Sequence, residues 1–275
     1  VDKNIPIILG CQLNIVPSLM DRDNRENRIS IIAKNEIGFS NLCKLTSISY
    51  LPDHFYKIPK ITLQELLDNK EGLIVTTGGM NGIIPQDIYM RTANAKSNFE
   101  LFKKEFGEDF YVELHIHNLT KDLEWSYRKK QHDDLGFDPQ EIVNKRLVEL
   151  AKQYNVKCYF AQNSFMKNKS SHLLQKIQIG NSLDGKTGWH YQNPMYTMSV
   201  EEMYEYIQEN SPYLLDIIDF KEACENSVEI LNKSKDIELK FEPALPDIKY
   251  NECNVNIGER HKDLEKELES LREIG

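Results

Sequence analysis

Short apolar runs rich in β-branched residues alternate along this chain with longer segments of helical periodicity, and this alternation constrains the fold more than any other feature. The strand-like runs cover residues 5–9, 29–33, 73–77, 111–114 and 156–161. Strands that alternate with helices build a largely parallel sheet with helices packed on it. The sequence therefore predicts an α/β fold.

The helix predicted over residues 139–154 shows the pattern most clearly. Val143, Leu147 and Leu150 recur at helical spacing and form one apolar stripe, and Asp138 precedes the first turn as an N-cap. A strand-like run follows almost at once. This step from helix to strand is the repeating unit of an α/β barrel or of an open sheet.

Beyond residue 161 the strand signals fade and helical signals take over. Ser199 and Glu202 form a capping box at the start of one helix, and a second helix is predicted over residues 214–231. A Pro-Ala-Leu-Pro break begins at Pro243. We therefore expect an α/β part at residues 1–195, a helical end at 196–242, and a linker with the start of a further region at 243–275.

Charge and cysteine usage limit the classes of partner and compartment. The chain carries 34 Lys and Arg against 43 Asp and Glu, a formal net charge of -9, which disfavours a self-sufficient nucleic-acid-binding domain. Its five cysteines include no C-x-x-C pair, which favours a reducing cytoplasm. No apolar run approaches the roughly 20 residues that cross a bilayer. We expect a cytoplasmic protein without membrane contact.

The motif search finds two local candidates for chemistry. The glycine-rich run at residues 78–82 follows a strand, where a phosphate loop could lie, but it lacks a Lys or Ser/Thr partner, so a tight turn is favoured. His115 and His117 follow another strand and share one face of it, so both imidazoles could bind one metal ion. The alternative for this pair is two satisfied or solvent-facing histidines. Glu113 lies on the same face.

Six segments, in order, resemble the PHP domain that opens the alpha subunit of bacterial DNA polymerase III. The most specific is Ala-Lys-Asn-Glu-x-Gly-(aromatic)-x-Asn-Leu-Cys-Lys-Leu at residues 33–45. The six matching segments lie at residues 6–12, 32–45, 71–86, 106–114, 177–184 and 198–203.

The resemblance implies a distorted (β/α)7 barrel with a helical C-terminal extension. The chain lacks an initiating methionine, and the family's first strands would lie upstream, so we expect this chain to lack them and to leave one edge of the strand at residues 5–9 unpaired. The spacing of the family also implies a surface insertion at about residues 118–138. The expected partners are the rest of the polymerase chain, including the missing N-terminal segment, and a proofreading exonuclease, with DNA bound only through the full polymerase.

The resemblance also implies a metal cluster of zinc or manganese, and this sequence departs from it at most positions. Only His117, with His115 beside it, falls where a family ligand is expected. A neutral amide, a guanidinium, a hydroxyl, a thioether or the absence of a side chain cannot replace carboxylate, imidazole and thiolate as ligands. The substituted ligand positions are Gln12, Arg28, Gly79, Ser164 and Met166.

We therefore expect an N-terminal polymerase segment that is a catalytically inactive scaffold and subunit-contact domain. It would hold no cofactor, because the magnesium-dependent polymerase site of the family belongs to a region beyond this segment. Two alternatives stay open: a stand-alone metal-dependent PHP phosphoesterase, and a non-enzymatic polymerase-like paralogue.

Overall fold

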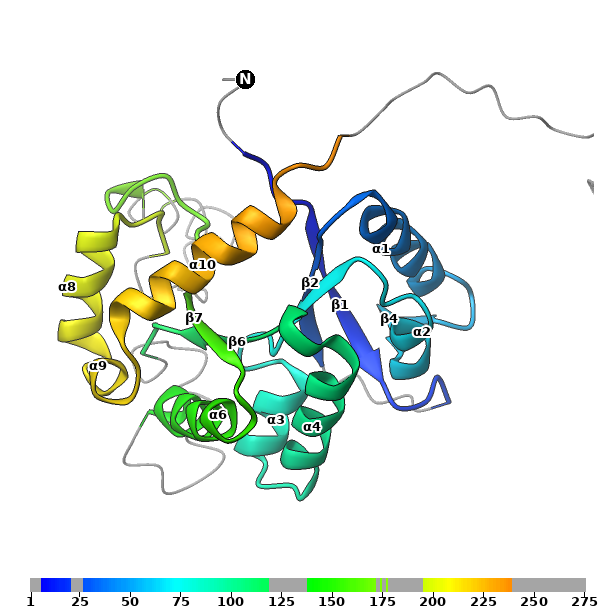
Figure 1. Ribbon diagram of the computed structural model, residues 1–275, viewed down its shortest axis with the longest axis horizontal. Helices are drawn as coiled ribbons and strands as arrows, with labels where there is room; N and C mark the ends of the chain where they lie inside the picture. Colours follow the sequence, from blue (N-terminus) through cyan, green and yellow to red (C-terminus); the bar gives the residue numbers. More distant parts are fainter. Residues whose placement is uncertain are drawn as a thin grey trace, which may run out of the picture. The chain divides into compact units, whose positions relative to one another are not determined.

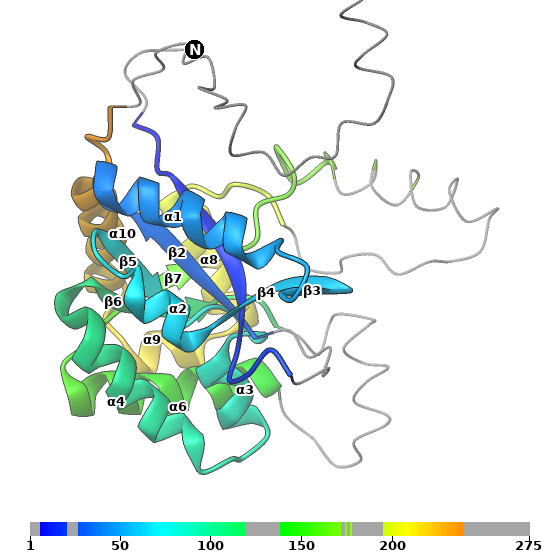
Figure 2. The same cartoon turned by 90° about the vertical axis from the view of Figure 1, so that its right-hand side faces the viewer.

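The computed structural model is an α/β fold and describes residues 6–20, 27–118, 138–171, 174, 177 and 195–238. Within these residues one mixed sheet has the strand order β3-β4-β1-β2-β5-β6-β7 (Figures 1 and 2). The strands are β1 (Gly10–Val16), β2 (Arg28–Ala33), β3 (Phe55–Tyr56), β4 (Ile58–Thr62), β5 (Leu73–Thr76), β6 (Phe110–His115) and β7 (Lys157–Ala161).

The sheet is mixed, so the prediction of a largely parallel sheet is only partly right. β1 is parallel to β4, and β5, β6 and β7 are parallel to one another, but β2 is antiparallel to both β1 and β5. The reason is the connection between β1 and β2: it spans residues 17–27, fewer than the dozen or more that a parallel crossover requires.

The first strand lies later in the chain than the sequence predicts. Residues 6–9 are outside any strand, and β1 begins at Gly10. Its neighbours are β2 on one edge and β4 on the other, so the expectation of an unpaired edge at the first strand is wrong for β1. In the described part of the chain no pairing joins β7 to β3 or β4, and closure of the sheet into a barrel stays a prediction.

Helices cover the face of the sheet that carries the main hydrophobic core, to which strand residues such as Leu13, Ile31, Val75, Val112 and Phe160 contribute. No described helix is both long and apolar enough to cross a membrane. The helices are α1 (Glu36–Ser49), α2 (Leu63–Asp68), α3 (Ile83–Tyr89), α4 (Asn94–Phe106), α6 (Pro139–Tyr154), α8 (Val200–Asn210), α9 (Tyr213–Ile217) and α10 (Phe220–Ser234), with a 3₁₀ turn η1 (Gly107–Asp109).

Local capping fixes where several helices begin. The side chain of Asp138 accepts a hydrogen bond from Gln140 N at the start of α6, and α8 has both halves of the predicted capping box. Asn35 caps α1. The first turn of α1 lies so close to Gly72, the residue before β5, that a Cβ atom added at Gly38 would be 1.9 Å from the carbonyl oxygen of Gly72. Only glycine fits at that contact.

The second predicted C-terminal helix is two helices. α9 ends at Ile217, Ile218 is extended, and the side chain of Asp219 caps a new helix, α10. The break lets α10 run beside β7, the last strand in the sheet order (Figure 1). Phe220 contacts Phe160, Asn226 donates a hydrogen bond to the carbonyl oxygen of Cys158, and Ile230 packs with Tyr111 on the opposite face of the sheet.

We call that opposite face, which carries Gln12, Ser30, Thr76, Glu113 and Tyr159, the inner face. Near the start of β6, hydrogen bonds and ion pairs join α10 to the strands on this face. Lys157 and Tyr111 both donate to the carboxylate of Glu229, and Lys233 lies 3.1 Å from Oδ1 of Asp109. The helical end and the sheet are therefore joined by packing and by ion pairs.

Candidate functional site

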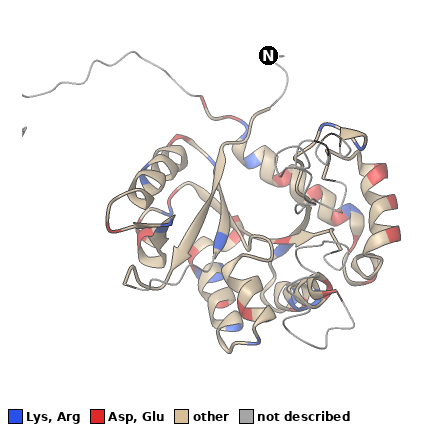
Figure 3. Cartoon of the chain, turned by 180° about the vertical axis from the view of Figure 1, so that it is seen from behind, with Lys and Arg blue, Asp and Glu red and all other residues tan. Residues whose placement is uncertain are grey.

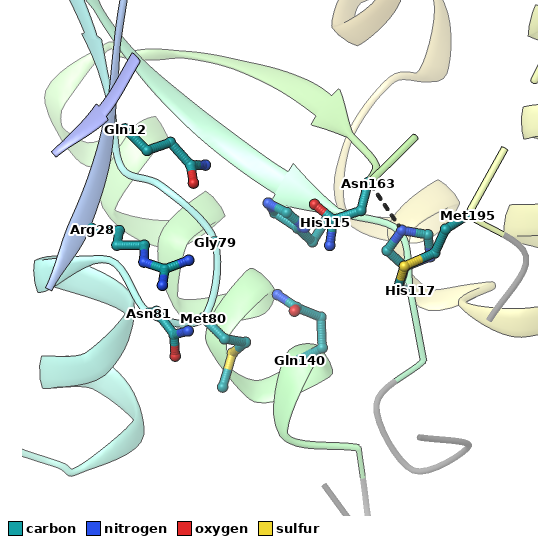
Figure 4. Close-up of a pocket in the computed structure, with 10 residues that line it drawn as sticks. All are labelled: Gln12, Arg28, Gly79, Met80, Asn81, His115, His117, Gln140, Asn163 and Met195. Carbon is teal, nitrogen blue, oxygen red and sulfur yellow. Dashed lines mark hydrogen bonds between the residues drawn. The ribbon is translucent and has the colours of Figure 1, made fainter. Parts of the chain in front are cut away.

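A cavity of about 190 Å³ lies at the other end of the inner face, where β6 ends (Figure 4). Strands β1 and β2 contribute Gln12 and Arg28, the turn after β5 contributes Gly79, and the end of β6 contributes His115 and His117. Thus five residues singled out from the sequence line one cavity. Its other lining residues are Met80, Asn81, Gln140, Asn163 and Met195.

The strand register explains why these residues meet. β1 and β2 are antiparallel, with Gln12 opposite Ser30 and Asn14 opposite Arg28, so the side chains of Gln12, Ser30 and Arg28 share the inner face. On β6, Glu113 and His115 alternate onto the same face. Figure 4 shows Gln12 and Arg28 pointing from their strands into the space that His115 faces.

Glu113 is buried next to the cavity, and four side chains share its carboxylate. Its Oε2 accepts hydrogen bonds from Thr76 at 2.6 Å, Tyr159 at 3.2 Å and Ser30 at 3.3 Å, and its Oε1 lies 2.7 Å from Nε2 of His115. Burial raises the pKa of this carboxyl, but the hydrogen bonds and the charge of His115 outweigh it and leave the pKa below the usual value. The carboxylate is therefore ionised, and Nε2 of His115 must carry the proton between them.

The ring of His115 occupies the space beside the glycine turn. A Cβ built on Gly79 would lie 2.9 Å from Nε2 and 3.1 Å from Cε1 of this ring. The absence of a side chain at position 79 thus makes room for His115 to turn back onto Glu113. Because Nε2 donates to Glu113, that nitrogen cannot bind a metal ion in this arrangement.

His117 is only 2% exposed, and its Nε2 accepts a hydrogen bond from the backbone N–H of Asn163 at 3.1 Å (Figure 4). Its Nδ1 is buried and has no hydrogen-bond partner in the described structure. Burial, and secondarily the charge of His115, lowers the pKa to about 3, so the ring is neutral at physiological pH. Since Nε2 accepts, Nδ1 carries the proton, and neither ring nitrogen offers a lone pair to a metal.

The remaining predicted positions do not join the cavity. Ser164 is exposed, and Met166 is half-buried against the main core and pairs with Tyr196 in an isolated bridge. Among the residues that the structure describes, no group of three or more His, Cys, Asp or Glu side chains could hold a metal ion. The described residues therefore do not fit the zinc or manganese cluster that the resemblance implies.

Three amide residues of the cavity carry no signal in the sequence: Asn81, Gln140 and Asn163. Gln140 stands in the first turn of α6 and donates to Asn144, which in turn donates to the carbonyl oxygen of His115. Asn163 contributes its backbone N–H to His117. Isolated amides belong to no motif, and only the fold brings them to this place.

Two predicted segments fall largely or wholly outside the described residues. They are the insertion at about 118–138, of which 119–137 are not described, and the linker at 243–275. In the described part, the longer helices α4, α6 and α10 carry both signs of charge, whereas α8 carries four Glu and no Lys or Arg (Figure 3).

Comparison with known proteins gives the following matches. A family model described as PHP domain matches residues 1–117. A DNA polymerase III subunit alpha from Borreliella burgdorferi is 35% identical over 219 residues, which are 79% of this chain and 17% of that protein. The same subunit from Caulobacter vibrioides is 26% identical over 258 residues, 89% of this chain and 20% of that protein. The subunit from Aquifex aeolicus is 28% identical over 159 residues, 56% of this chain and 12% of that protein.

Proposed function

Because this chain is a PHP-domain region homologous to the N-terminal part of DNA polymerase III alpha subunits, we propose that it acts as a scaffold and subunit-contact region of a replicative polymerase and performs no metal-dependent phosphoester chemistry itself. The chain spans 20% or less of the length of the three relatives described above. Nucleotidyl transfer is accordingly a property of the whole polymerase in this proposal, and DNA is bound through that larger protein in the cytoplasm.

One observation carries the proposal. Nε2 of His115 donates to Glu113 and Nε2 of His117 accepts from Asn163, so the two rings do not offer a pair of lone pairs to one metal ion. Metal-dependent hydrolysis needs an ion that polarises the ester or activates a water molecule. The cavity is lined by amides, thioethers, a glycine, one guanidinium and two imidazoles whose Nε2 atoms are hydrogen-bonded, and it has no carboxylate or thiolate to hold such an ion.

The (β/α)7 barrel of the family is part of the proposal. So are the two partners that the resemblance implies, namely the rest of the polymerase chain and a proofreading exonuclease. Helices cover the core face of the sheet, and on the inner face the hydrogen bonds of Glu113 and the contacts of α10 join the strands. Such a sheet offers a stable body on which these contacts can be built.

The test has two arms, and both use the 275-residue chain. In the first, nuclease and phosphomonoesterase assays with added Mn²⁺ should give no turnover, while a PHP region that keeps its ligands serves as the positive control. Turnover that survives purification and falls in His117→Ala would favour a stand-alone phosphoesterase instead.

In the second arm, size-exclusion chromatography of the chain with the exonuclease subunit of the same replication system should give a joint peak. Failure of the two proteins to associate, together with failure to associate with the remainder of the polymerase, would remove the subunit-contact role and leave a non-enzymatic paralogue.

A further inference from the structure

A second cavity, of about 350 Å³, lies where the end of β1 meets α3 and the start of α4, two helices that pack side by side (Figures 1 and 2). It shares no lining residue with the cavity at the end of β6. We infer that this second cavity, which we call the Asp87 cavity, binds the guanidinium group of an arginine side chain or of a small alkylguanidine. The inference goes beyond the proposed function and does not depend on the metal-free site.

Asp87 gives the cavity its charge, and no cation in the described structure neutralises it. It is the only ionisable residue among those that line the cavity. Oδ1 accepts a hydrogen bond from the hydroxyl of Thr92 at 2.6 Å and Oδ2 accepts one from Nδ2 of Asn98 at 2.7 Å, and both donors are neutral. In the described part of the chain Asp87 forms no ion pair. A carboxylate has about four lone-pair positions, so each oxygen can accept a second hydrogen bond.

The donors around Asp87 are largely used within the protein, which leaves acceptors for a ligand. Nε2 of Gln86 donates to the carbonyl oxygen of Met80 at 2.7 Å and to Oδ1 of Asn81 at 3.4 Å. The hydroxyl of Thr92 and Nδ2 of Asn98 donate to Asp87. The structure records no hydrogen bond to Oε1 of Gln86 or to Oδ1 of Asn98. The cavity therefore presents a carboxylate and two amide oxygens, a set that favours a cation with several N–H donors.

A guanidinium fits this set better than an ammonium does. It is planar, always charged, and carries five N–H donors in a fixed fork, two of which match the two oxygens of one carboxylate. The remaining donors can reach amide oxygens on either side of Asp87. An ammonium has three donors at one point and is more strongly hydrated, so it loses more on entering the cavity. An anion is disfavoured because Asp87 would repel it.

The apolar part of the wall suits the stem of such a ligand. Val16, Ile83 and Met90 also line the cavity, and methylene groups that carry a cationic head pack well against side chains of this kind. The volume lies at the lower end of the roughly 300–1,000 Å³ that pockets for small organic molecules occupy. The ligand is therefore an alkyl chain that ends in a guanidinium, supplied either by a partner protein or by a free small molecule.

The experiment is a calorimetric titration of the 275-residue chain with N-acetyl-arginine N-methylamide at constant ionic strength. Saturable binding is expected. The citrulline counterpart, which has the same shape without the charge, should not bind, and the lysine counterpart should bind more weakly. Asp87→Asn should weaken binding of the arginine compound at least tenfold. The matched control is Asp68→Asn, because Asp68 is a helix aspartate that likewise accepts from a side-chain amide, that of Gln64. It should bind as the unchanged chain does.

A second variant covers the case in which Asp87→Asn does not fold. Met90 is 54% exposed at the C-terminus of α3, so Met90→Lys adds a cation beside the cavity without disturbing the core. It should weaken binding while circular dichroism shows a folded chain. To separate the two sources of ligand, butylguanidinium is compared with a capped Gly-Gly-Arg-Gly-Gly peptide. Tighter binding of the peptide assigns the cavity to an arginine of a partner protein, and equal or weaker binding of the peptide assigns it to a free small molecule.

Three results would overturn the inference. They are the absence of saturable binding of any guanidinium compound, equal binding of the citrulline or lysine counterpart, and binding unchanged in both Asp87→Asn and Met90→Lys. None of them bears on the proposed scaffold role, which is tested by the nuclease assays and by association with the polymerase subunits.

Discussion

Nε2 of His115 lies 2.9 Å from the point that a Cβ atom would occupy on Gly79. Real Cβ atoms essentially never approach another heavy atom closer than 3.0 Å, so a side chain at position 79 and the present orientation of His115 exclude each other. The absence of a side chain at position 79 and the contact of His115 with Glu113 are therefore coupled. Four predictions follow from this and related contacts.

Replacing Gly79 with alanine should destabilise the fold by about 1–3 kcal/mol, because the added methyl group overpacks the site against the imidazole of His115. Urea unfolding measures the loss. The matched control is the same substitution in a His115→Ala background, where the cost should fall to less than half. An equal cost in both backgrounds would show that the two residues do not compete for space.

Replacing Glu113 with glutamine should cost about 2–4 kcal/mol, since an ionised acceptor of several hydrogen bonds becomes a neutral amide with one acceptor oxygen. Tyr159→Phe removes a single donor and should cost only about 1 kcal/mol. Glu149→Gln on the surface of α6 should change stability by less than about 0.5 kcal/mol. A Glu113→Gln variant as stable as this surface control would mean that the hydrogen bonds of the Glu113 carboxylate do not stabilise the fold.

Acid should weaken the attachment of α10 to the sheet, because it protonates the carboxylate of Glu229. Burial raises the pKa of this carboxyl, but hydrogen bonds from Lys157, Tyr111 and Lys233 outweigh it and lower the pKa to about 2. A carboxyl whose pKa is lower in the folded state stabilises the fold above its unfolded value of roughly 4.3, and that stabilisation is lost as the pH falls towards 2.

The measurement is the free energy of unfolding of the unchanged chain and of Glu229→Gln between pH 7 and pH 3. The difference between the two should be largest near neutral pH and shrink as the pH falls below about 5. His117 also destabilises the fold in acid, because its pKa of about 3 lies below its unfolded value and the unfolded state takes up the proton first. That contribution is common to both proteins and cancels in the difference, so a difference independent of pH would contradict the role of Glu229.

The purified chain should hold far less than one zinc or manganese ion per molecule after dialysis, because Nε2 of His115 donates to Glu113 and neither nitrogen of His117 presents a lone pair, so at most a single isolated ring nitrogen is left to an ion. Elemental analysis is the check, and His117→Ala should leave the value unchanged. About one equivalent of metal that disappears in His117→Ala would mean that the hydrogen bonds of these rings open to admit an ion.

Sequence reasoning succeeds where the determinants are local. The bounds of α6 were predictable because its N-cap at Asp138, its apolar stripe and the left-handed Asn155 that ends it all lie within the same segment. The predicted resemblance is confirmed by the PHP-domain match and by the polymerase relatives. The position of β1 was missed because Gln12 and Asn14 interrupt its apolar residues, whereas the run at residues 5–9 looks more like a buried strand.

The site was only partly within reach of the sequence. Gln12 and Gly79 could be singled out by their places in matching segments, and Arg28 and His117 by their places beside such segments. The fold brings all four to one cavity together with His115. Ser164 and Met166 were expected beside them and lie elsewhere. The orientation of each imidazole could not be predicted, because it depends on acceptors and donors such as Glu113 and Asn163 on the sheet and on the loop after β7.

The contacts of α10 with β7 also set an order of events during synthesis. The hydrogen bond between Tyr111 and Glu229 spans 118 positions, so both parallel strands β6 and β7 leave the ribosome well before the helix that completes them. Until α10 emerges, the outer edge of β7 and the Tyr111 end of the inner face lack the cover that this helix gives them. A bare strand edge is a template for pairing with other chains. The nascent protein is thus most vulnerable to misassembly in this interval, and a translational pause before residue 220 would prolong it.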